Sequence, residues 1–272
     1  AGAYDPRWQD AAEAWPQLEA QLHPLRDTLA AIVYEPVLQG AGGMRLYSPD
    51  LLRRLGAWAQ AHGVDVIADE IAAGMGRCGT LLAGFHAQCS PADADAVRPD
   101  IIALSKGLTG GFMPFSAVLT TDALYQLFDA DYHEHRAFLH SNTYTGHALG
   151  VAAAHAVLDA LAEDGILEHV AQHGPGLRQG LEALARTRPY LHRPRGIGMM
   201  AAVDLAQTDG QALDPRARTG YAVYQAAIAR GALLRNLGDT LYLFPPLNTE
   251  PADLDAMVRI LADAAADVMG PA

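Results

Sequence analysis

Lysine is almost missing from this sequence, because its 272 residues include 18 arginines and one lysine, Lys106. Cysteine is also scarce, with Cys78 and Cys89 as the only two. Two thiols eleven residues apart cannot build a structural zinc site by themselves, and a protein with so few cysteines is typically found in a reducing compartment. We therefore expect no bound metal and a cytoplasmic location.

Long apolar runs and an excess of positive charge are absent too. No apolar run approaches the roughly 18 residues that a membrane span needs. The first ten residues, AGAYDPRWQD, have neither the basic segment nor the apolar segment of a signal peptide. The net charge of -12 disfavours a surface for nucleic acid or for an anionic membrane. The sequence therefore predicts no nucleic-acid partner and no membrane partner.

What the first 165 residues do contain is an alternation of apolar runs with amphipathic helical patterns. Continuous apolar strands separated by helices predict an α/β fold with a parallel or mixed sheet covered on both faces. Ser48, Pro49 and Gly63 are typical of the N-cap, first turn and C-cap of a helix over 48–63. The strands are expected at 29–36, 64–70, 99–105 and 115–121.

Beyond the Ala-rich helix expected over 147–165, the pattern changes to that of a smaller α+β unit. Strands are predicted at 197–205 and 241–247, between amphipathic helices. We therefore expect a large α/β domain over residues 1–160 and a small α+β domain over residues 161–272.

Candidate reactive side chains follow two of the predicted strands. The acidic pair Asp69–Glu70 ends one strand, and Lys106 directly follows the next. The carboxyl ends of strands form the ligand crevice in open α/β sheets. Arginine would serve at least as well as lysine for phosphate, but only lysine can deprotonate and attack a carbonyl. A lysine amine together with a carboxylate for a ring nitrogen is what pyridoxal phosphate requires.

Two other motifs offer different chemistry, and both fit poorly. The loop GMGRCG, residues 74–79, matches the glycine spacing of a dinucleotide fingerprint. It does not join its strand directly to a helix, and Asp69 and Glu70 before it would repel pyrophosphate, so nicotinamide binding is disfavoured. His133 and His135 flank Glu134 without the spacing that places two zinc ligands on one helix face.

Four longer stretches of the chain carry recognisable motifs, namely IVYEPVLQGAGGM, VIADEIAAGMGRCG, LSKGLTGG and HSNTYTGHALG. In their order and spacing they resemble the class III (subgroup II) pyridoxal-phosphate aminotransferases. The resemblance implies a fold-type I transferase, with part of its large domain followed by the small domain, and pyridoxal 5'-phosphate as cofactor. It also implies a keto acid and an amino donor as small-molecule substrates, and a homodimer. Because residues 1–34 show no cofactor-phosphate loop, the chain resembles the C-terminal portion of such an enzyme.

The resemblance assigns cofactor roles to individual residues. Lys106 matches the Schiff-base lysine, which also moves the proton during transamination, and Asp69 matches the partner of the ring nitrogen. Ile71 is expected to pack against the ring. Thr143 matches the residue that binds the cofactor phosphate across the dimer interface. Glu35 is expected near the cofactor.

The resemblance also bears on the substrate. Arg235 matches the arginine that pairs with the carboxylate of the keto acid, and Arg77 matches a second arginine of the substrate pocket. The stretches EPVLQGAGGMRLYSP and GALLRNLGDTLYLFPPL are most similar to the branch that aminates 7-keto-8-aminopelargonate with S-adenosylmethionine, in biotin biosynthesis. Two alternatives stay open, namely a class III enzyme for ω-amino acids or diamines, and an inactive fragment or interaction module.

Overall fold

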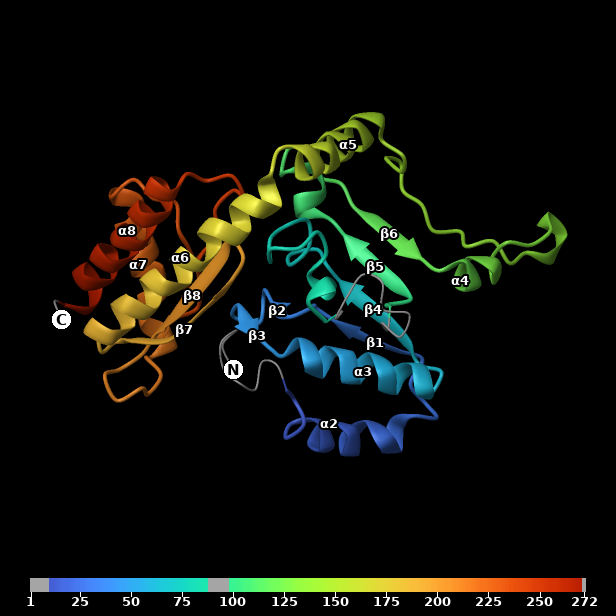
Figure 1. Ribbon diagram of the computed structural model, residues 1–272, viewed down its shortest axis with the longest axis horizontal. Coiled ribbons are helices and arrows are strands. Elements are labelled where there is room, and N and C mark those ends of the chain that lie inside the picture. The colour runs from blue at the N-terminus through green and yellow to red at the C-terminus, as the bar shows by residue number, and fades with distance from the viewer. Residues whose placement is uncertain (1–9, 88–97, 271–272) are drawn as a thin grey trace.

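The computed structural model describes residues 10–87 and 98–270, so Cys89 lies outside the described residues. Two separate four-stranded sheets organise these residues, and Figure 1 shows them next to each other. We call residues 10–163 the first-sheet unit and residues 166–270 the second-sheet unit. The expected change of pattern near residue 160 falls in the last turn of helix α5, and the chain enters the second-sheet unit through Gly165.

The first-sheet unit contains a mixed sheet in the strand order β1-β4-β5-β6. Strands β1, β4 and β5 are parallel, and β6 is antiparallel to β5. The four strands lie within the four runs expected to form them, which confirms the α/β prediction for this unit. Its elements are α2 (Trp15–Leu22), η1 (His23–Leu25), β1 (Ala31–Tyr34), β2 (Leu38–Gln39), β3 (Arg45–Leu46), α3 (Pro49–Ala61), β4 (Asp65–Asp69), η2 (Ala83–Ala87), β5 (Ile101–Leu104), η3 (Lys106–Thr109), β6 (Ala117–Thr120), α4 (Asp122–Gln126), η4 (Tyr132–Glu134) and α5 (Ala148–Glu163).

Helix α3 begins where Ser48 predicts and ends slightly earlier than expected, with His62 rather than Gly63 as its C-cap. The hydroxyl of Ser48 accepts hydrogen bonds from the backbone N–H groups of Asp50 and Leu51, which the first helical turn would otherwise leave unpaired. Gly63 follows the helix with φ 65°, a conformation that glycine adopts without strain.

Only one face of the first sheet is well covered within the described residues. Helix α3 packs there against β1 and β4, and α5 packs against β5. On the opposite face, Val33 of β1 is 65% exposed and Val118 of β6 is 69% exposed. The sequence predicts cover on both faces, and the described residues supply it on one, because none of their helices packs on the second.

The second-sheet unit is an antiparallel sheet in the order β7-β8-β10-β9, packed against three long helices. The strand expected over 197–205 is instead the end of one strand and all of the next, since the chain turns at Gly198, which has φ 52°. The elements are α6 (Ile166–Thr187), β7 (Leu191–Ile197), β8 (Met200–Leu205), η5 (Pro215–Ala217), α7 (Thr219–Ala229), β9 (Arg235–Leu237), β10 (Thr240–Leu243) and α8 (Pro251–Met269). None of the helices in the described part of the chain is both long and apolar enough to cross a membrane.

A buried cluster joins the two units. Val37, Leu38 and Cys78 of the first-sheet unit pack with Met200 and Ala202 of β8. Cys78 is 1% exposed, and its burial raises the pKa of the thiol, so it fills the core between the two units. The shared cluster means that the two units hold each other in place.

A buried ion pair stabilises the second sheet. Asp204 on β8 is 6% exposed and accepts two hydrogen bonds from the guanidinium of Arg195, at 2.9 and 3.0 Å, and one from Thr240. Burial by itself would raise the pKa of Asp204, but these bonds outweigh it and hold the pKa below its ordinary value. A carboxyl group of this kind contributes stability above its unfolded pKa of about 3.9, and the contribution disappears as the pH falls through the lower folded value.

Replacing Asp204 with asparagine tests this contribution. The variant keeps one acceptor oxygen but leaves Arg195 without its full charge partner. We expect the free energy of unfolding at pH 7 to fall by about 2–3 kcal/mol. Urea denaturation at several pH values measures it. The gap between wild type and variant should close as the pH falls below about 4, and a gap that stays constant into acid would contradict the assignment.

Candidate active site

The ends of two adjacent parallel strands bring the main candidate residues to one edge of the first sheet. Asp69 is the last residue of β4 and is paired in register with Ala103 of β5. Lys106 begins η3, two residues beyond the end of β5. Since the carboxyl ends of parallel strands meet at one edge, both positions lie at the crevice that such sheets use for ligands.

Asp69 lies beside Glu35 in one pocket. We call this the aspartate pocket, a space of about 510 Å³ whose lining includes Val33, Glu35 and Tyr47. The Oδ1 atom of Asp69 accepts a hydrogen bond of 3.0 Å from the backbone N–H of Ile71. Glu35 accepts a hydrogen bond of 2.8 Å from the backbone N–H of Gly40. Glu35 therefore lies near Asp69, and its place near a cofactor stays a prediction.

Lys106 faces a different pocket, which lies between the two units. We call this the lysine pocket, a space of about 550 Å³ lined on one side by Ala72, Gly74 and Lys106 and on the other by Phe244, Pro246 and Leu247. Lys106 is exposed and has φ 37°, in the left-handed region where a side chain is strained. Within residues 10–87 and 98–270, its amine has no hydrogen-bond or ion-pair partner. A free amine on a strained turn is available to react with a bound carbonyl compound.

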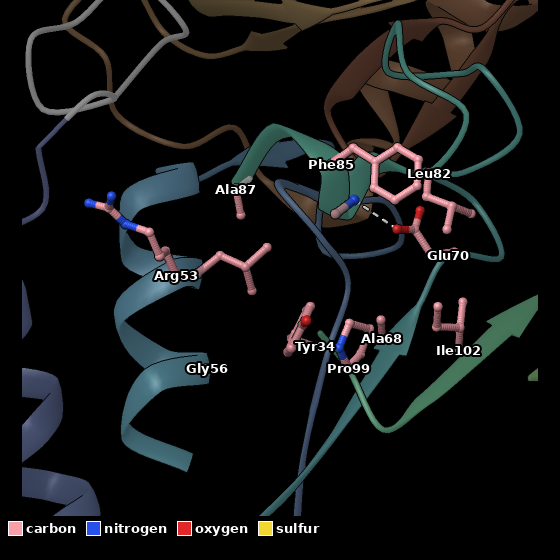
Figure 2. Close-up of a pocket in the computed structure, with 12 residues that line it drawn as sticks. Tyr34, Arg53, Gly56, Ala68, Glu70, Leu82, Phe85, Ala87, Pro99 and Ile102 are labelled. Atoms are coloured by element: carbon pink, nitrogen blue, oxygen red, sulfur yellow. Dashed lines mark hydrogen bonds between the residues drawn. The ribbon is translucent and has the colours of Figure 1, made fainter. Parts of the chain in front are cut away.

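Glu70 has a structural role that the acidic pair in the sequence did not reveal. Its side chain is 2% exposed, and its two oxygens accept hydrogen bonds of 2.9 and 2.8 Å from the backbone N–H groups of Ala83 and Gly84. Figure 2 shows one of these hydrogen bonds, with the carboxylate of Glu70 lying below Leu82 and Phe85 in the view. Burial raises the pKa of Glu70. Neighbouring residues of a strand point to opposite faces, and that alternation could have separated Asp69 from Glu70 in advance.

Arg77 lines the lysine pocket, but its hydrogen bonds are to the backbone. Its Nη1 donates to the carbonyl oxygens of Met199, at 2.7 Å, and Pro245, at 2.5 Å. Its guanidinium carbon lies 3.9 Å from the centre of the Phe244 ring. Burial lowers the pKa of Arg77 to about 10, so the group stays charged at neutral pH.

Two expected site residues lie elsewhere in this chain. Arg235 is exposed on β9, and Thr143 is exposed in the segment 127–147 between α4 and α5. Neither contributes to the lining of the aspartate or the lysine pocket. Figure 1 shows that the segment between α4 and α5 projects away from the first sheet.

The loop 74–79 lies between β4 and η2, and the histidine pair lies in the segment between α4 and α5. The glycine loop leads into the 3-10 helix η2 rather than directly into an α-helix, so it lacks the context of a dinucleotide site. His133 and His135 are exposed at η4, in the projecting segment. No group of side chains that could hold a metal is found in the described ranges.

Comparison with known proteins points to one family. The profile of the family described as Aminotransferase class-III matches residues 4–265. The adenosylmethionine-8-amino-7-oxononanoate aminotransferase of Synechococcus elongatus is 44% identical over 237 residues, which cover 86% of this chain and 52% of that protein. The chain spans about half the length of the curated relatives it matches.

Solved structures agree with this assignment. The adenosylmethionine-8-amino-7-oxononanoate aminotransferase of Methanocaldococcus jannaschii superimposes with a TM-score of 0.87 at 25% identity, covering 95% of this chain and 58% of that one. A PLP-bound amine transaminase from an uncultivated Pseudomonas species superimposes with a TM-score of 0.83 at 33% identity, covering 94% and 56%. These neighbours have the fold that the strand and helix pattern predicts. The chain therefore belongs to the class III aminotransferase family.

Proposed function

We propose that this chain forms part of a pyridoxal-phosphate-dependent aminotransferase that converts 7-keto-8-aminopelargonate to 7,8-diaminopelargonate with S-adenosylmethionine as amino donor. The observation that carries the proposal is the position of the single lysine. Lys106 stands just beyond β5, next to the strand that ends at Asp69, and its amine, which has no partner among the described residues, faces the pocket between the two units. The names of the relatives at 44% and 35% identity support the choice of substrates.

The residues present fit the reactive end of the cofactor. Lys106 would offer its amine to the cofactor aldehyde, and Asp69, at the end of the neighbouring strand, would offer its carboxylate to the ring nitrogen, although the two side chains line different pockets. The Oδ2 atom of Asp69 accepts no hydrogen bond within the described ranges, so it remains available for this contact. When bound, the cofactor supplies an electron sink for the electrons released as a Cα–H bond breaks.

The roles of the two residues follow from their chemistry. Lys106 would take the proton from Cα and return it to the cofactor carbon C4′, two bonds away, which requires an amine that can be both deprotonated and protonated. Asp69 would hold a proton at the ring nitrogen, because a carboxylate favours the charged form of a neighbouring cationic group. Ile71 would pack against the ring, and Arg235 would pair with the keto-acid carboxylate as a bidentate donor.

A donor screen tests the proposed reaction. The protein is loaded with cofactor, and each amine is added without an acceptor. We expect S-adenosylmethionine to convert the cofactor to its aminated form, which is followed by absorbance. Failure with S-adenosylmethionine and success with a diamine would favour the second candidate, an enzyme for amines or ω-amino acids. The similarity to the amine transaminase supports that candidate.

The open face of the first sheet supports a requirement for more chain than the residues described. Val33 and Val118 on that face are more exposed than apolar residues of a sheet covered on both faces. The relatives are also about twice as long as this chain. We propose that activity belongs to such a longer protein, acting in the cytoplasm. Cofactor titration of the 272-residue chain and of a full-length version would show whether the chain by itself binds the cofactor, or is an inactive fragment.

We also propose that a second copy of the chain packs against the projecting segment 127–147. Large apolar side chains are exposed there, including Tyr132 at 93%, Phe138 at 67% and Leu139 at 95%. A patch of this kind is typical of an interface rather than of a free surface. Packing of a second copy would also bring Thr143 of one subunit toward the cofactor phosphate of the other, as the family resemblance implies.

The double variant Phe138→Asp, Leu139→Asp tests the interface. Two charges in an apolar interface core each cost about 2 kcal/mol or more, so we expect dimer affinity to fall by at least about a thousandfold. Sedimentation or light scattering measures the mass in solution. Leu233→Asp is the matched control, because Leu233 is 75% exposed in the second-sheet unit. A dimer that survives the double variant, or that Leu233→Asp dissociates equally, would contradict this interface.

A further inference from the structure

The glycine-rich loop 74–79 makes a close backbone approach to the second-sheet unit. A side chain at Gly198, in the turn between β7 and β8, would place its Cβ 2.3 Å from the carbonyl oxygen of Arg77. A side chain at Gly174 of α6 would place its Cβ 2.4 Å from the carbonyl oxygen of Gly198. The loop, the turn and the helix therefore stack backbone on backbone, which only glycine permits.

Hydrogen bonds hold this junction from both directions. The backbone N–H of Met199 donates to the carbonyl oxygen of Arg77 at 2.9 Å, while Nη1 of Arg77 donates back to the carbonyl oxygen of Met199. The same Nη1 also donates to Pro245, at the end of β10, and the guanidinium covers Phe244. All of these contacts reach from the first-sheet unit to the second.

Arg195 makes the reciprocal contact at another place. From β7 of the second-sheet unit, it donates to the carbonyl oxygens of Gly43, at 2.5 Å, and Met44, at 2.9 Å, in the first-sheet unit. Arg195 does not line the lysine pocket, whereas Arg77 does. The two arginines thus make the same kind of contact between units, but only Arg77 makes it at the lysine pocket.

The contact of Arg77 bears directly on the lysine pocket. Phe244, Pro246 and Leu247 form its wall in the second-sheet unit, and Pro245 lies between them in the chain. Holding the Pro245 carbonyl therefore holds this wall at a set distance from Lys106. Both Nη1 hydrogens are used by backbone carbonyls, and the face of the guanidinium is used by Phe244.

We propose that Arg77 is a positioning residue that docks the β8 and β10 ends onto the loop 74–79 and so sets the width of the lysine pocket, instead of pairing with a substrate carboxylate. The effect on turnover rests on the proposed aminotransferase function, but the docking contact does not. A substrate held between the two walls depends on their spacing whether or not it carries a carboxylate.

The test compares Arg77→Lys with Arg195→Lys in the full-length protein. Both variants keep the charge and lose the planar guanidinium, which binds two carbonyls through Nη1 in Arg77 and through Nε and Nη2 in Arg195. Hydrogen exchange reports the docking without any activity. We expect Arg77→Lys to speed exchange at the amides of Met199, Phe244 and Leu247 by about tenfold, the equivalent of one charged hydrogen bond. Arg195→Lys should instead speed exchange over residues 43–46 and around Asp204, to which Arg195 also donates.

Turnover then separates positioning from substrate binding. We expect Arg77→Lys to lower kcat/KM by about tenfold or more, to the same extent for a carboxylate-bearing donor and for a diamine. Arg195→Lys should change kcat/KM by less than about twofold. A loss confined to carboxylate-bearing substrates would make Arg77 a substrate ligand and overturn the proposal. So would unchanged exchange in Arg77→Lys, or an equal loss of turnover in Arg195→Lys. If wild type transaminates no donor, the proposed function fails, while the exchange result still decides the docking.

Discussion

Lys106→Arg is expected to abolish transamination, with a loss of at least about 10⁴-fold in kcat. Arginine keeps the positive charge and nearly the length of lysine, but its guanidinium stays protonated in proteins. It can neither attack the cofactor aldehyde nor take a proton from Cα. The chain has arginine at 18 other positions, so the substitution also tests why lysine is needed at this one. Steady-state turnover and borohydride reduction, followed by peptide mapping, measure the two losses.

Lys106→Ala provides the control for charge. If Lys106 served only as a cation for the cofactor phosphate, arginine would retain most of the activity and alanine would lose it. If Lys106 acts through its free amine, both variants lose turnover and both lose the reducible covalent link to the cofactor. Turnover of Lys106→Arg above about one hundredth of wild type would contradict the proposed role. Because Lys106 is exposed, neither substitution should unfold the protein, and unfolding would not explain the loss of turnover.

Asp69→Asn is expected to lower kcat by about 10²–10⁴-fold while the cofactor stays attached to Lys106. The amide has the same shape but no negative charge, so it no longer favours a proton at the ring nitrogen. Its oxygen can still accept the hydrogen bond from Ile71, and the local turn should be retained. Absorbance spectra measure cofactor binding, and single-turnover kinetics measure the proton-transfer step.

Glu70→Gln is the matched control, because it removes the adjacent carboxylate on the opposite side of the strand. Glu70 accepts two backbone hydrogen bonds with separate oxygens, and glutamine would meet one of these donors with an NH₂ group. We expect a cost of about 1–3 kcal/mol in the free energy of unfolding and a change in kcat smaller than about tenfold. A larger kinetic defect in Glu70→Gln than in Asp69→Asn would show that the roles of the two carboxylates are reversed.

Local patterns in the sequence were sufficient to predict the strands of the first sheet and the candidate reactive residues at the ends of those strands. Apolar runs bounded by polar residues specify β1, β4, β5 and β6, and Ser48 specifies the start of α3, because both signals act over a few residues. The second sheet was predicted less completely. β7 contains polar residues and Pro194, and β9 has three residues, so neither shows a clear alternation.

What the sequence alone determined is the chemistry: a single deprotonatable amine at Lys106, a carboxylate at Asp69, and the family motifs around them. Only the tertiary structure separated Asp69 from Glu70, left Arg235 and Thr143 away from both pockets, and placed Arg77 at the junction of the two units. Arg77 bonds to backbone carbonyls 122 and 168 residues further along the chain. A pattern of neighbouring residues carries no information about partners at that separation, because it is the packing of whole units that brings them together.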